Sequence, residues 1–468
     1  METFKSFLSE QKSEKYRILV ISAERNQNKM FHTAQRITDE ANKLGHDVYV
    51  VRVEGAFINY DNGYKIYNKD DDKGFEINDE NTIAIVRGSV RLKKSSLDLL
   101  SQLEKIGVCM VNSRNTVAVS SDKYRTYLRL QDYGLTQPKT VLIPDANSTE
   151  NALESLDKKF PLILKTLEGS KGVGVLFIES ERSLKSIVQL LFSQNEDVDL
   201  LVQEYIKTDG DIRVIVLGDE VIASMKREVI EGDFRSNVSQ GAKVSEYQLT
   251  ELEKDECLKA AKAIDGSWTA VDFIPSSDRE KKPPFILEVN HSPGTEGIEE
   301  ATKKNIVKMV VEYFSYAENR YPVPNVCGFI ENIEVEPFGH LVAKFDTGNG
   351  ATAPTIHADK IKVSGKEITW SHGDKTTTNK IMRTVKVDVG GLNDYSETRY
   401  AILLDITFAG TTYKDVEFLI DDREDRTPVL LNRSIMRKMN VMVNPRRKYI
   451  ITKSEMKGKN EWNQAILL

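Results

Sequence analysis

Short apolar runs alternate with a segment of helical periodicity at the start of the chain. Residues 16–22 are mostly apolar, residues 29–44 repeat apolar positions with helical spacing, and residues 46–53 are again apolar. This pattern predicts a strand, a helix and a second strand. Because that order forms a βαβ unit, residues 16–111 are predicted to be an α/β domain with a parallel sheet, after a flexible arm at 1–15.

A further strand of this sheet is predicted at residues 82–87, after an exposed polar excursion at 61–80, and it ends on Arg87. Ligands bind beyond the carboxyl ends of strands in open α/β sheets, so Arg87 can contact an anionic acceptor. The alternative is that Arg87 and the nearby Arg91 are solvated loop charges, which the pattern alone favours.

A second domain is predicted at residues 112–318, and it contains an apolar strand in which Lys165 is the only charge. A glycine-rich stretch follows directly and includes Gly169, Ser170, Gly172 and Gly174. Glycines let backbone N–H groups approach phosphate oxygens closely, and Lys165 can reach the same anion. The stretch is neither a Walker A loop nor a Rossmann fingerprint, and a flexible hairpin turn is the alternative.

Two further places can contact a nucleotide. An apolar strand ends with Glu204, Tyr205 and Ile206, whose backbone edge can hydrogen-bond an adenine while Tyr205 and Ile206 pack on its face. Downstream, Arg227 and Arg235 can face anionic groups, although basic residues in such places are usually solvated.

Oxygen ligands gather on two predicted buried strands at 268–274 and 285–290. The two-residue period of a strand puts Glu288 and Asn290 on one face, and Asp272 lies on the neighbouring strand. A carboxylate and carboxamide set of this kind suits Mg²⁺, which takes the rest of its shell from waters and nucleotide phosphates. The alternative is an ordinary strand end followed by a turn.

Taken together, these stretches resemble the ATP-grasp fold, and more closely the RimK-type amino-acid ligases, over about residues 112–314. The motifs that carry the resemblance are residues 162–175, 201–207, 231–237 and 287–294. The resemblance implies ATP and Mg²⁺ (or Mn²⁺) as cofactors. By position, it implies nucleotide contacts at Lys123, Lys165, Glu204, Tyr205, Asp211, Arg235, Ser236 and Asn237, and metal ligands at Asp272, Glu288 and Asn290.

RimK-type ligases add glutamate to the C-terminal end of a protein through an acyl phosphate, so the implied partners are glutamate and a peptide or protein tail, with a ribosomal protein as one candidate. In this mechanism Lys165 and Arg235 stabilise the transferring phosphoryl group, and Arg227 is the catalytic residue at the acyl centre. Arg87 would lie near the acceptor.

After a proline-bearing linker at 319–326, residues 327–468 are β-rich and predict a small barrel. The expected strands are residues 326–335, 340–345, 360–370, 380–389, 400–408, 412–420 and 448–452. Asp346 opens an Asp-Thr-Gly triplet after one of these runs. Such an aspartate can activate water if a second carboxylate lies close by, although on the triplet alone a turn aspartate is the better interpretation.

The longer context resembles retropepsin-like aspartic proteases of the RimB type, through residues 344–348, 355–358 and 426–435. This resemblance implies a catalytic Asp346 and a homo-oligomer, because two copies of the triplet must meet in a dimer. One departure is Asn432, which stands where such barrels place glycine. His340, His357 and His372 do not form a recognised zinc motif.

Composition narrows the remaining possibilities. The chain has 468 residues, too many for one core, and a net charge of −6, which argues against a dedicated nucleic-acid binder. It has neither a signal peptide nor an apolar run long enough to cross a bilayer, so a cytoplasmic protein is expected. Three widely spaced cysteines are expected to be buried apolar residues.

The sequence therefore predicts an α/β plus all-β architecture: an ATP-dependent carboxylate–amine ligase joined to a barrel that trims peptide bonds. Two alternatives stay open. The barrel can be a non-catalytic module that binds the acceptor, and the ligase can act on small molecules, as in dipeptide or glutathione synthesis.

Overall fold

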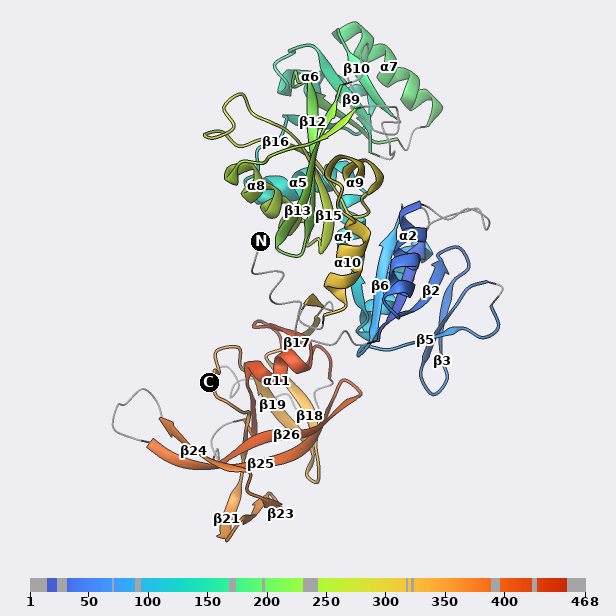
Figure 1. Cartoon of the computed structure of the whole chain (residues 1–468). Helices are drawn as coiled ribbons and strands as arrows, with labels where there is room; N and C mark the ends of the chain where they lie inside the picture. The colour runs from blue at the N-terminus through green and yellow to red at the C-terminus, as the bar shows by residue number, and fades with distance from the viewer. Residues whose placement is uncertain are drawn as a thin grey trace. The chain divides into compact units, whose positions relative to one another are not determined.

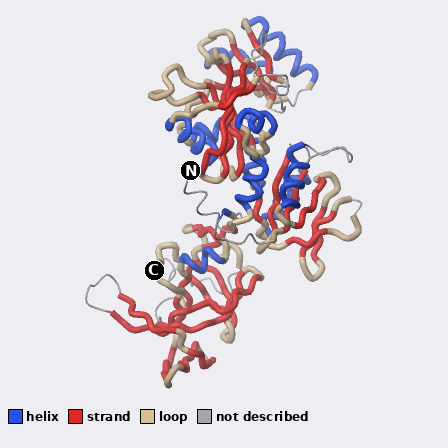
Figure 2. Tube along the Cα trace, viewed as in Figure 1, coloured by secondary structure: helices blue, strands red, loops and turns tan. Residues whose placement is uncertain are grey.

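The structure is a computed structural model, and it describes residues 15–22, 32–69, 71–88, 94–167, 174–195, 198–229, 243–316, 319–320, 324–388, 396–422 and 427–452. The chain divides into two compact units, Met1–Val323 and Pro324–Leu468. Figure 2 shows that helices and strands mix in the first unit, whereas strands dominate the second.

The first unit begins with a parallel sheet in the order β2, β1, β6 and β7, which confirms the parallel α/β prediction (Figure 1). Its central strands β1 and β6 are apolar because both of their faces are buried. The strands are β1 (Arg17–Ser22), β2 (Asp47–Arg52), β6 (Thr82–Arg87) and β7 (Cys109–Val111), and the helices are α2 (His32–Lys43) and α3 (Lys94–Ile106).

The polar excursion expected at 61–80 is more ordered than its composition indicates. It contributes to an antiparallel sheet of β3 (Phe57–Tyr60), β4 (Tyr64–Tyr67) and β5 (Phe75–Ile77). Aromatic pairs across the strands, such as Phe57 on Tyr67 with ring centroids 5.1 Å apart, stabilise it. The prediction of an exposed segment holds in part, since Tyr64 is 40% exposed whereas Ile66 is fully buried.

The rest of the first unit is built on two antiparallel sheets, in the orders β10-β9-β11-β8 and β14-β13-β12-β15-β16. The first comprises β8 (Thr140–Ile143), β9 (Leu162–Thr166), β10 (Val175–Ile178) and β11 (Leu200–Glu204). The second comprises β12 (Gly210–Leu217), β13 (Glu220–Glu228), β14 (Val244–Glu246), β15 (Trp268–Ile274) and β16 (Phe285–Asn290).

Helices with well-defined first turns pack around these sheets (Figure 1). Asp122 and Ser180 cap two of them through their side chains, and Thr250 and Glu253 form a capping box on a third. The helices are α4 (Arg114–Ser120), α5 (Lys123–Asp132), α6 (Thr149–Ser155), α7 (Glu181–Gln194), α8 (Glu251–Ala263), α9 (Glu296–Thr302) and α10 (Ile306–Phe314). Helix α10 packs against α2, so the α/β domain shares a core with the β12–β15 sheet.

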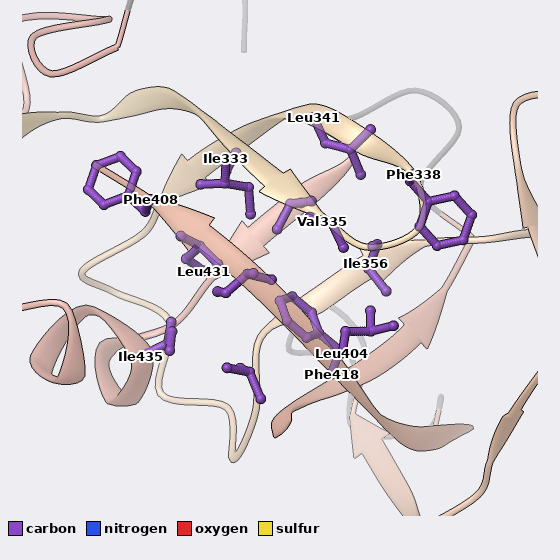
Figure 3. Packing of buried hydrophobic residues seen from close by; sticks show 14 of the residues in the cluster. Ile333, Val335, Phe338, Leu341, Ile356, Leu404, Phe408, Phe418, Leu431 and Ile435 are labelled. Atoms are coloured by element: carbon purple, nitrogen blue, oxygen red, sulfur yellow. The ribbon is translucent and has the colours of Figure 1, made fainter. Parts of the chain in front are cut away.

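The second unit contains a closed barrel in which β18, β19, β27, β20, β26 and β25 follow one another and β25 pairs back to β18. Apolar side chains fill its interior, among them Ile333, Phe418 and Leu431 (Figure 3). The strands are β17 (Asn325–Gly328), β18 (Ile330–Val335), β19 (Gly339–Phe345), β20 (Thr355–His357), β24 (Arg383–Asp388), β25 (Ser396–Phe408), β26 (Thr411–Asp421), β27 (Val429–Leu431) and β28 (Val441–Asn444), with one helix, α11 (Arg433–Lys438), among the described residues.

Three expected strands of this unit need correction. The run at 326–335 is divided between β17 and β18, which belong to different sheets. The run at 360–370 is a hairpin of β21 (Asp359–Ser364) and β22 (Glu367–His372), because Gly365 takes a positive φ of 63° at the turn, and β23 (Lys375–Lys380) extends it.

The strand expected at 448–452 is wrong. The N–H groups of residues 450–452 donate to the buried carboxylate of Glu331 at 2.8–3.1 Å instead of to a neighbouring strand. A carboxylate can thus replace a sheet partner for an apolar segment.

The cysteine prediction is confirmed: Cys109, Cys257 and Cys327 are buried and unpaired with one another. Within the described residues, every helix is too short or too polar to span a bilayer.

Candidate functional site

The predicted metal ligands meet on two paired strands, β15 and β16, of the β14-β13-β12-β15-β16 sheet. Asp272 on β15 lies directly opposite Glu288 on β16 in the strand register, and Asn290 lies two residues farther along β16. The Asn290 amide donates to Oε1 of Glu288 at 3.0 Å. Three oxygen-bearing side chains are therefore brought to one place by strand alternation and register.

Two arginines of the same sheet contact this group. Arg213 on β12 donates to both oxygens of Asp272, at 2.8 and 2.6 Å. Arg227 on β13 lies 3.0 Å from Asp272 and donates to both oxygens of Asp211, at 2.6 and 2.8 Å. Arg227 and Asp272 are 4% and 2% exposed, so these ion pairs are shielded from water.

The two paired carboxyl groups respond differently to burial. Burial alone would raise the pKa of Asp272, but the guanidinium groups of Arg213 and Arg227 lower it below its usual value. Burial and the negative charge of Asp272 raise the pKa of Glu288. A divalent cation would relieve the repulsion between these carboxylates, and each oxygen retains lone pairs beyond its arginine contacts, so the set fits Mg²⁺.

Lys165, on β9 of the β10-β9-β11-β8 sheet, is close enough to Glu288 to be affected by its charge. Its ammonium donates to Gln203 at 2.7 Å, and Gln203 is held in turn by Thr140. Burial lowers the pKa of Lys165 to about 8, with Glu288 opposing the shift and Lys123 adding to it. A half-buried ammonium that donates to a neutral amide has donor capacity left for a phosphate.

Lys123 begins α5 and donates to the backbone oxygens of Thr166 and Leu167, both at 3.0 Å. These carbonyls directly precede the glycine-rich stretch. At the end of that stretch, Gly174 has a φ of 79°, and a Cβ there would come within 2.3 Å of Oγ1 of Thr166. Glycine is therefore required at this position; Gly169, Ser170 and Gly172 lie outside the described residues.

The predicted adenine contacts follow β11. Glu204 is fixed by reciprocal bonds with the backbone of Lys139, and the Tyr205 ring meets the Phe177 ring edge-on at 5.1 Å. Ile206 follows as a half-buried residue without secondary structure. Arg235, Ser236 and Asn237 lie outside the described residues.

Arg87 is not a solvated loop charge, so the interpretation that the pattern favoured is wrong. It is 4% exposed, donates to the carbonyl of Pro293 at 2.6 Å and lies 4.7 Å from the centroid of the Trp268 ring. Burial lowers its pKa to about 9. Its Nε and Nη1 are buried and have no hydrogen-bond partner among the described residues, whereas Arg91 lies outside them.

In the second unit, Asp346 follows β19 as a half-buried residue whose backbone N–H donates to Leu431. Its carboxylate accepts from the N–H of Gly348 at 3.0 Å. Asn432, the departure from the expected glycine, caps α11 and donates to the carbonyl of Ala351 at 2.7 Å. The asparagine thus holds the loop that carries Asp346.

Arg213 and Gln203 also belong to the first site, although the sequence did not predict them as site residues. Arg213 shares a strand face with Asp211, so the same two-residue period that selected Glu288 and Asn290 could have selected it. Gln203 precedes Glu204, and only the pairing of β11 with β9 brings it near Lys165.

Solved structures and family models both include proteins similar to this chain. The solved structure "Structure of ATP-grasp ligase PsnB complexed with precursor peptide PsnA2 and AMPPNP" aligns at a TM-score of 0.49 and 18% identity over 66% of this chain and 99% of that one. The model of the RimK-like ATP-grasp domain matches residues 120–314, all in the first unit.

Two curated relatives share about a third of their residues with this chain. A "Probable alpha-L-glutamate ligase" of Pseudoalteromonas translucida is 34% identical over 292 residues, or 62% of this chain and 93% of that protein. A protein of the same name from Marinobacter nauticus is 33% identical over 293 residues, with the same shares. From the matched domain and these relatives, this chain belongs to the RimK-like ATP-grasp family, whose ligases use ATP and Mg²⁺.

Proposed function

We propose that this chain joins glutamate to the C-terminal end of a peptide or protein, as an ATP-dependent carboxylate–amine ligase. The observation that carries the proposal is the register pair of Asp272 and Glu288, which is flanked by the buried Arg227 and the half-buried Arg213 and shares its electrostatic environment with Lys165. Such a set is suited to phosphates and a divalent cation together. The relatives named as alpha-L-glutamate ligases support glutamate as the added amino acid.

In this proposal ATP lies between the two sheets of the ligase. The backbone at Glu204 and Tyr205 binds the adenine, and Lys165 contacts the phosphates. Lys123, which is anchored to the carbonyls before the glycine-rich stretch, holds that stretch near the nucleotide. Asp211, Arg235, Ser236 and Asn237 complete the set of proposed nucleotide contacts, with Gly169, Ser170, Gly172 and Gly174 around the phosphates.

Two substitutions make up the proposed reaction. An oxygen of the acceptor carboxylate attacks the γ-phosphorus, the bond to the bridging oxygen breaks, and ADP leaves. The amine nitrogen of glutamate then attacks the acyl carbon, phosphate leaves with the oxygen it received, and the amine proton passes to solvent. Lys165 and Arg235 stabilise charge on the phosphoryl group, and Arg227 acts at the acyl centre, where Asp211 and Asp272 hold its guanidinium in place.

Asp272, Glu288 and Asn290 are the residues that would hold Mg²⁺ or Mn²⁺. When bound, the cation supplies positive charge that offsets the charge of the phosphates. The chain's own contribution is to fix the two carboxylates at one register position and to keep water from Arg227.

Mass spectrometry of reaction products tests the ligase proposal. The full chain is incubated with ATP, Mg²⁺, single amino acids and peptides with acidic tails, with Glu288→Gln as the inactive comparison. Peptides extended by glutamate, formed together with ADP by the wild type alone, support the proposal. ADP formation with free small molecules but with none of the peptides would favour a dipeptide-type ligase with a non-catalytic barrel.

A second proposed activity concerns the barrel, where Asp346 lies on a tight turn at the end of β19. We propose that two copies of the chain bring their Asp346 carboxylates together and hydrolyse peptide bonds, trimming the ligase product. Light scattering should then give a dimer, and Asp346→Asn should abolish trimming and leave ligation intact. Hydrolysis that survives this substitution would exclude the proposal.

For the ligase activity, ribosomal proteins are the first protein acceptors to test.

A further inference from the structure

Three side chains of the second unit form a cluster outside both proposed sites. His357 ends β20 in the barrel, Asp359 begins β21, and His372 ends β22. Because β21 pairs with β22, Asp359 lies opposite Ser371 and next to His372. One nitrogen or oxygen from each of the three residues lies within 4.8 Å of the others. The fold thus joins two of the histidines that form no motif in the sequence.

His357 lies between two carboxylates. Its Nε2 is 3.0 Å from Oδ1 of Asp359, and its Nδ1 is 3.7 Å from Oδ1 of Asp422. Two ligands on a Zn²⁺ ion, with bonds of about 2.0–2.2 Å, lie about 3–3.5 Å apart, so Nε2 and Oδ1 already have the spacing of two ligands. Asp422 faces the other ring nitrogen, as carboxylates do when they orient a metal-binding histidine.

The His372 ring has a nitrogen that is free to bind an ion. Its Nδ1 is buried and has no hydrogen-bond partner within the described part of the chain. The ring meets the His357 ring edge-on, with centroids 5.5 Å apart, and packs against Phe338.

We propose that His357, Asp359 and His372 bind one divalent transition-metal ion of the Zn²⁺ class, with water in the open position. Two imidazoles and a carboxylate favour Zn²⁺ over Mg²⁺ or Ca²⁺, which select oxygen ligands. The remaining adjustment is small, because atoms that lie within 4.8 Å of one another exceed the spacing of two ligands by about 1.5 Å at most.

The three proposed ligands come from two different sheets, so a bound ion would link these sheets. His357 belongs to a barrel strand, whereas Asp359 and His372 belong to the β21–β22 hairpin. An ion bound to all three would fix the hairpin sheet, labelled β21 and β23 in Figure 1, to the barrel wall. Asp359, whose side chain is 39% exposed, leaves a path for the ion from solvent.

Metal binding to the full chain tests this proposal without reference to ligation. Protein stripped with chelator is loaded with Zn²⁺ in the presence of excess Mg²⁺ and ATP, passed over a desalting column and analysed for zinc. The wild type and the control His340→Ala, which changes an exposed histidine of β19, should each retain one Zn²⁺ per chain. His372→Ala and Asp359→Asn should retain none, and Asp422→Asn should bind about 10–100-fold more weakly.

Spectroscopy keeps the proposal falsifiable if the variants fold poorly. Zn²⁺ should shift the ring proton resonances of His357 and His372 in the wild type and leave those of His340 unchanged. Co²⁺ should give visible absorption without a thiolate charge-transfer band. A wild type that retains no Zn²⁺, or equal retention by wild type and His372→Ala, would overturn the proposal.

Discussion

Asp272 in the first unit and Glu331 in the second are both carboxylates withdrawn from water, at 2% and 0% exposure. Asp272 is surrounded by side chains of opposite charge: Arg213 donates to both of its oxygens, and Arg227 lies 3.0 Å away. These partners sit at the ends of flexible side chains. They can therefore rotate toward the phosphates of a nucleotide or yield an oxygen to a cation.

Glu331 is neutralised by the backbone instead. Its oxygens accept the N–H groups of Gly328 and of residues 450–452 at 2.7–3.1 Å, together with the hydroxyl of Thr452. Backbone donors cannot turn away without unfolding the segment. The difference shows that a buried carboxylate marks a binding site only when its partners are able to exchange.

The largest effect is expected for Asp272→Asn. This change removes a negative partner from the buried guanidinium group of Arg227 and from the half-buried one of Arg213. Ligation should therefore fall by about 10²–10³-fold and the free energy of unfolding by roughly 3–5 kcal/mol. Product formation and chemical denaturation measure the two effects. Asp219→Asn, in the exposed turn between β12 and β13, should leave both unchanged; equal behaviour of the two variants would refute the role of the pair.

Glu331→Gln should destabilise the second unit by about 2–4 kcal/mol, because the amide cannot accept all of the backbone N–H groups. ADP formation by the first unit should persist. Differential scanning calorimetry of the full chain measures the loss, with Glu334→Gln on the exposed face of β18 as the matched control. A Glu331→Gln chain that melts like wild type would mean that the backbone donors find water instead.

Arg87 differs from both carboxylates. Its buried Nε and Nη1 donate neither to a side chain nor to the backbone within the described residues. If an acceptor carboxylate completes its contacts, Arg87→Gln should raise the KM for the acceptor by about 10–100-fold, with little change in the KM for ATP. Steady-state kinetics against Arg129→Gln, an exposed arginine of α5, measure this. Equal increases in both KM values would argue against an acceptor contact.

Lys165 gives the smallest effect, a change in pH dependence. Its pKa is lowered by burial to about 8, so the free enzyme loses this positive charge as the pH rises through 8. The value of kcat/KM for ATP should then fall about tenfold for each pH unit above 8. Lys165→Arg, whose charge persists, should remove this limb from the pH profile; a wild-type profile that stays flat to pH 10 contradicts the assignment.

Much of the first unit could be predicted from its sequence because local patterns determine it. The strand period places Glu288 and Asn290 on one face, and apolar runs separated by helical spacing predict the parallel sheet. The pattern could not predict which side chains of neighbouring strands each face would contact. Arg213 reaches Asp272 through the register of β12 against β15, between residues far apart in sequence.

The barrel of the second unit was predicted correctly from its strand-like runs, but individual strands were not, because their partners are distant in sequence. Residues 448–452 have the apolar character of a strand, but Glu331, more than a hundred residues earlier, binds their N–H groups. The first unit has one comparable case, in which aromatic pairs between residues 57 and 67 stabilise a sheet that composition did not indicate. Asp346 was identified from its triplet, and a dimer would depend on a partner molecule that no single-chain pattern encodes.

The contacts of Glu331 also bear on the order in which the protein is made. Glu331 needs residues 450–452, and β17, at the start of the second unit, pairs with β28 near residue 444. A ribosome delivers the first of these partners well over a hundred residues before the last. The ligase unit can therefore complete its folding while the barrel, dominated by distant contacts, still waits for its closing segment to be synthesised.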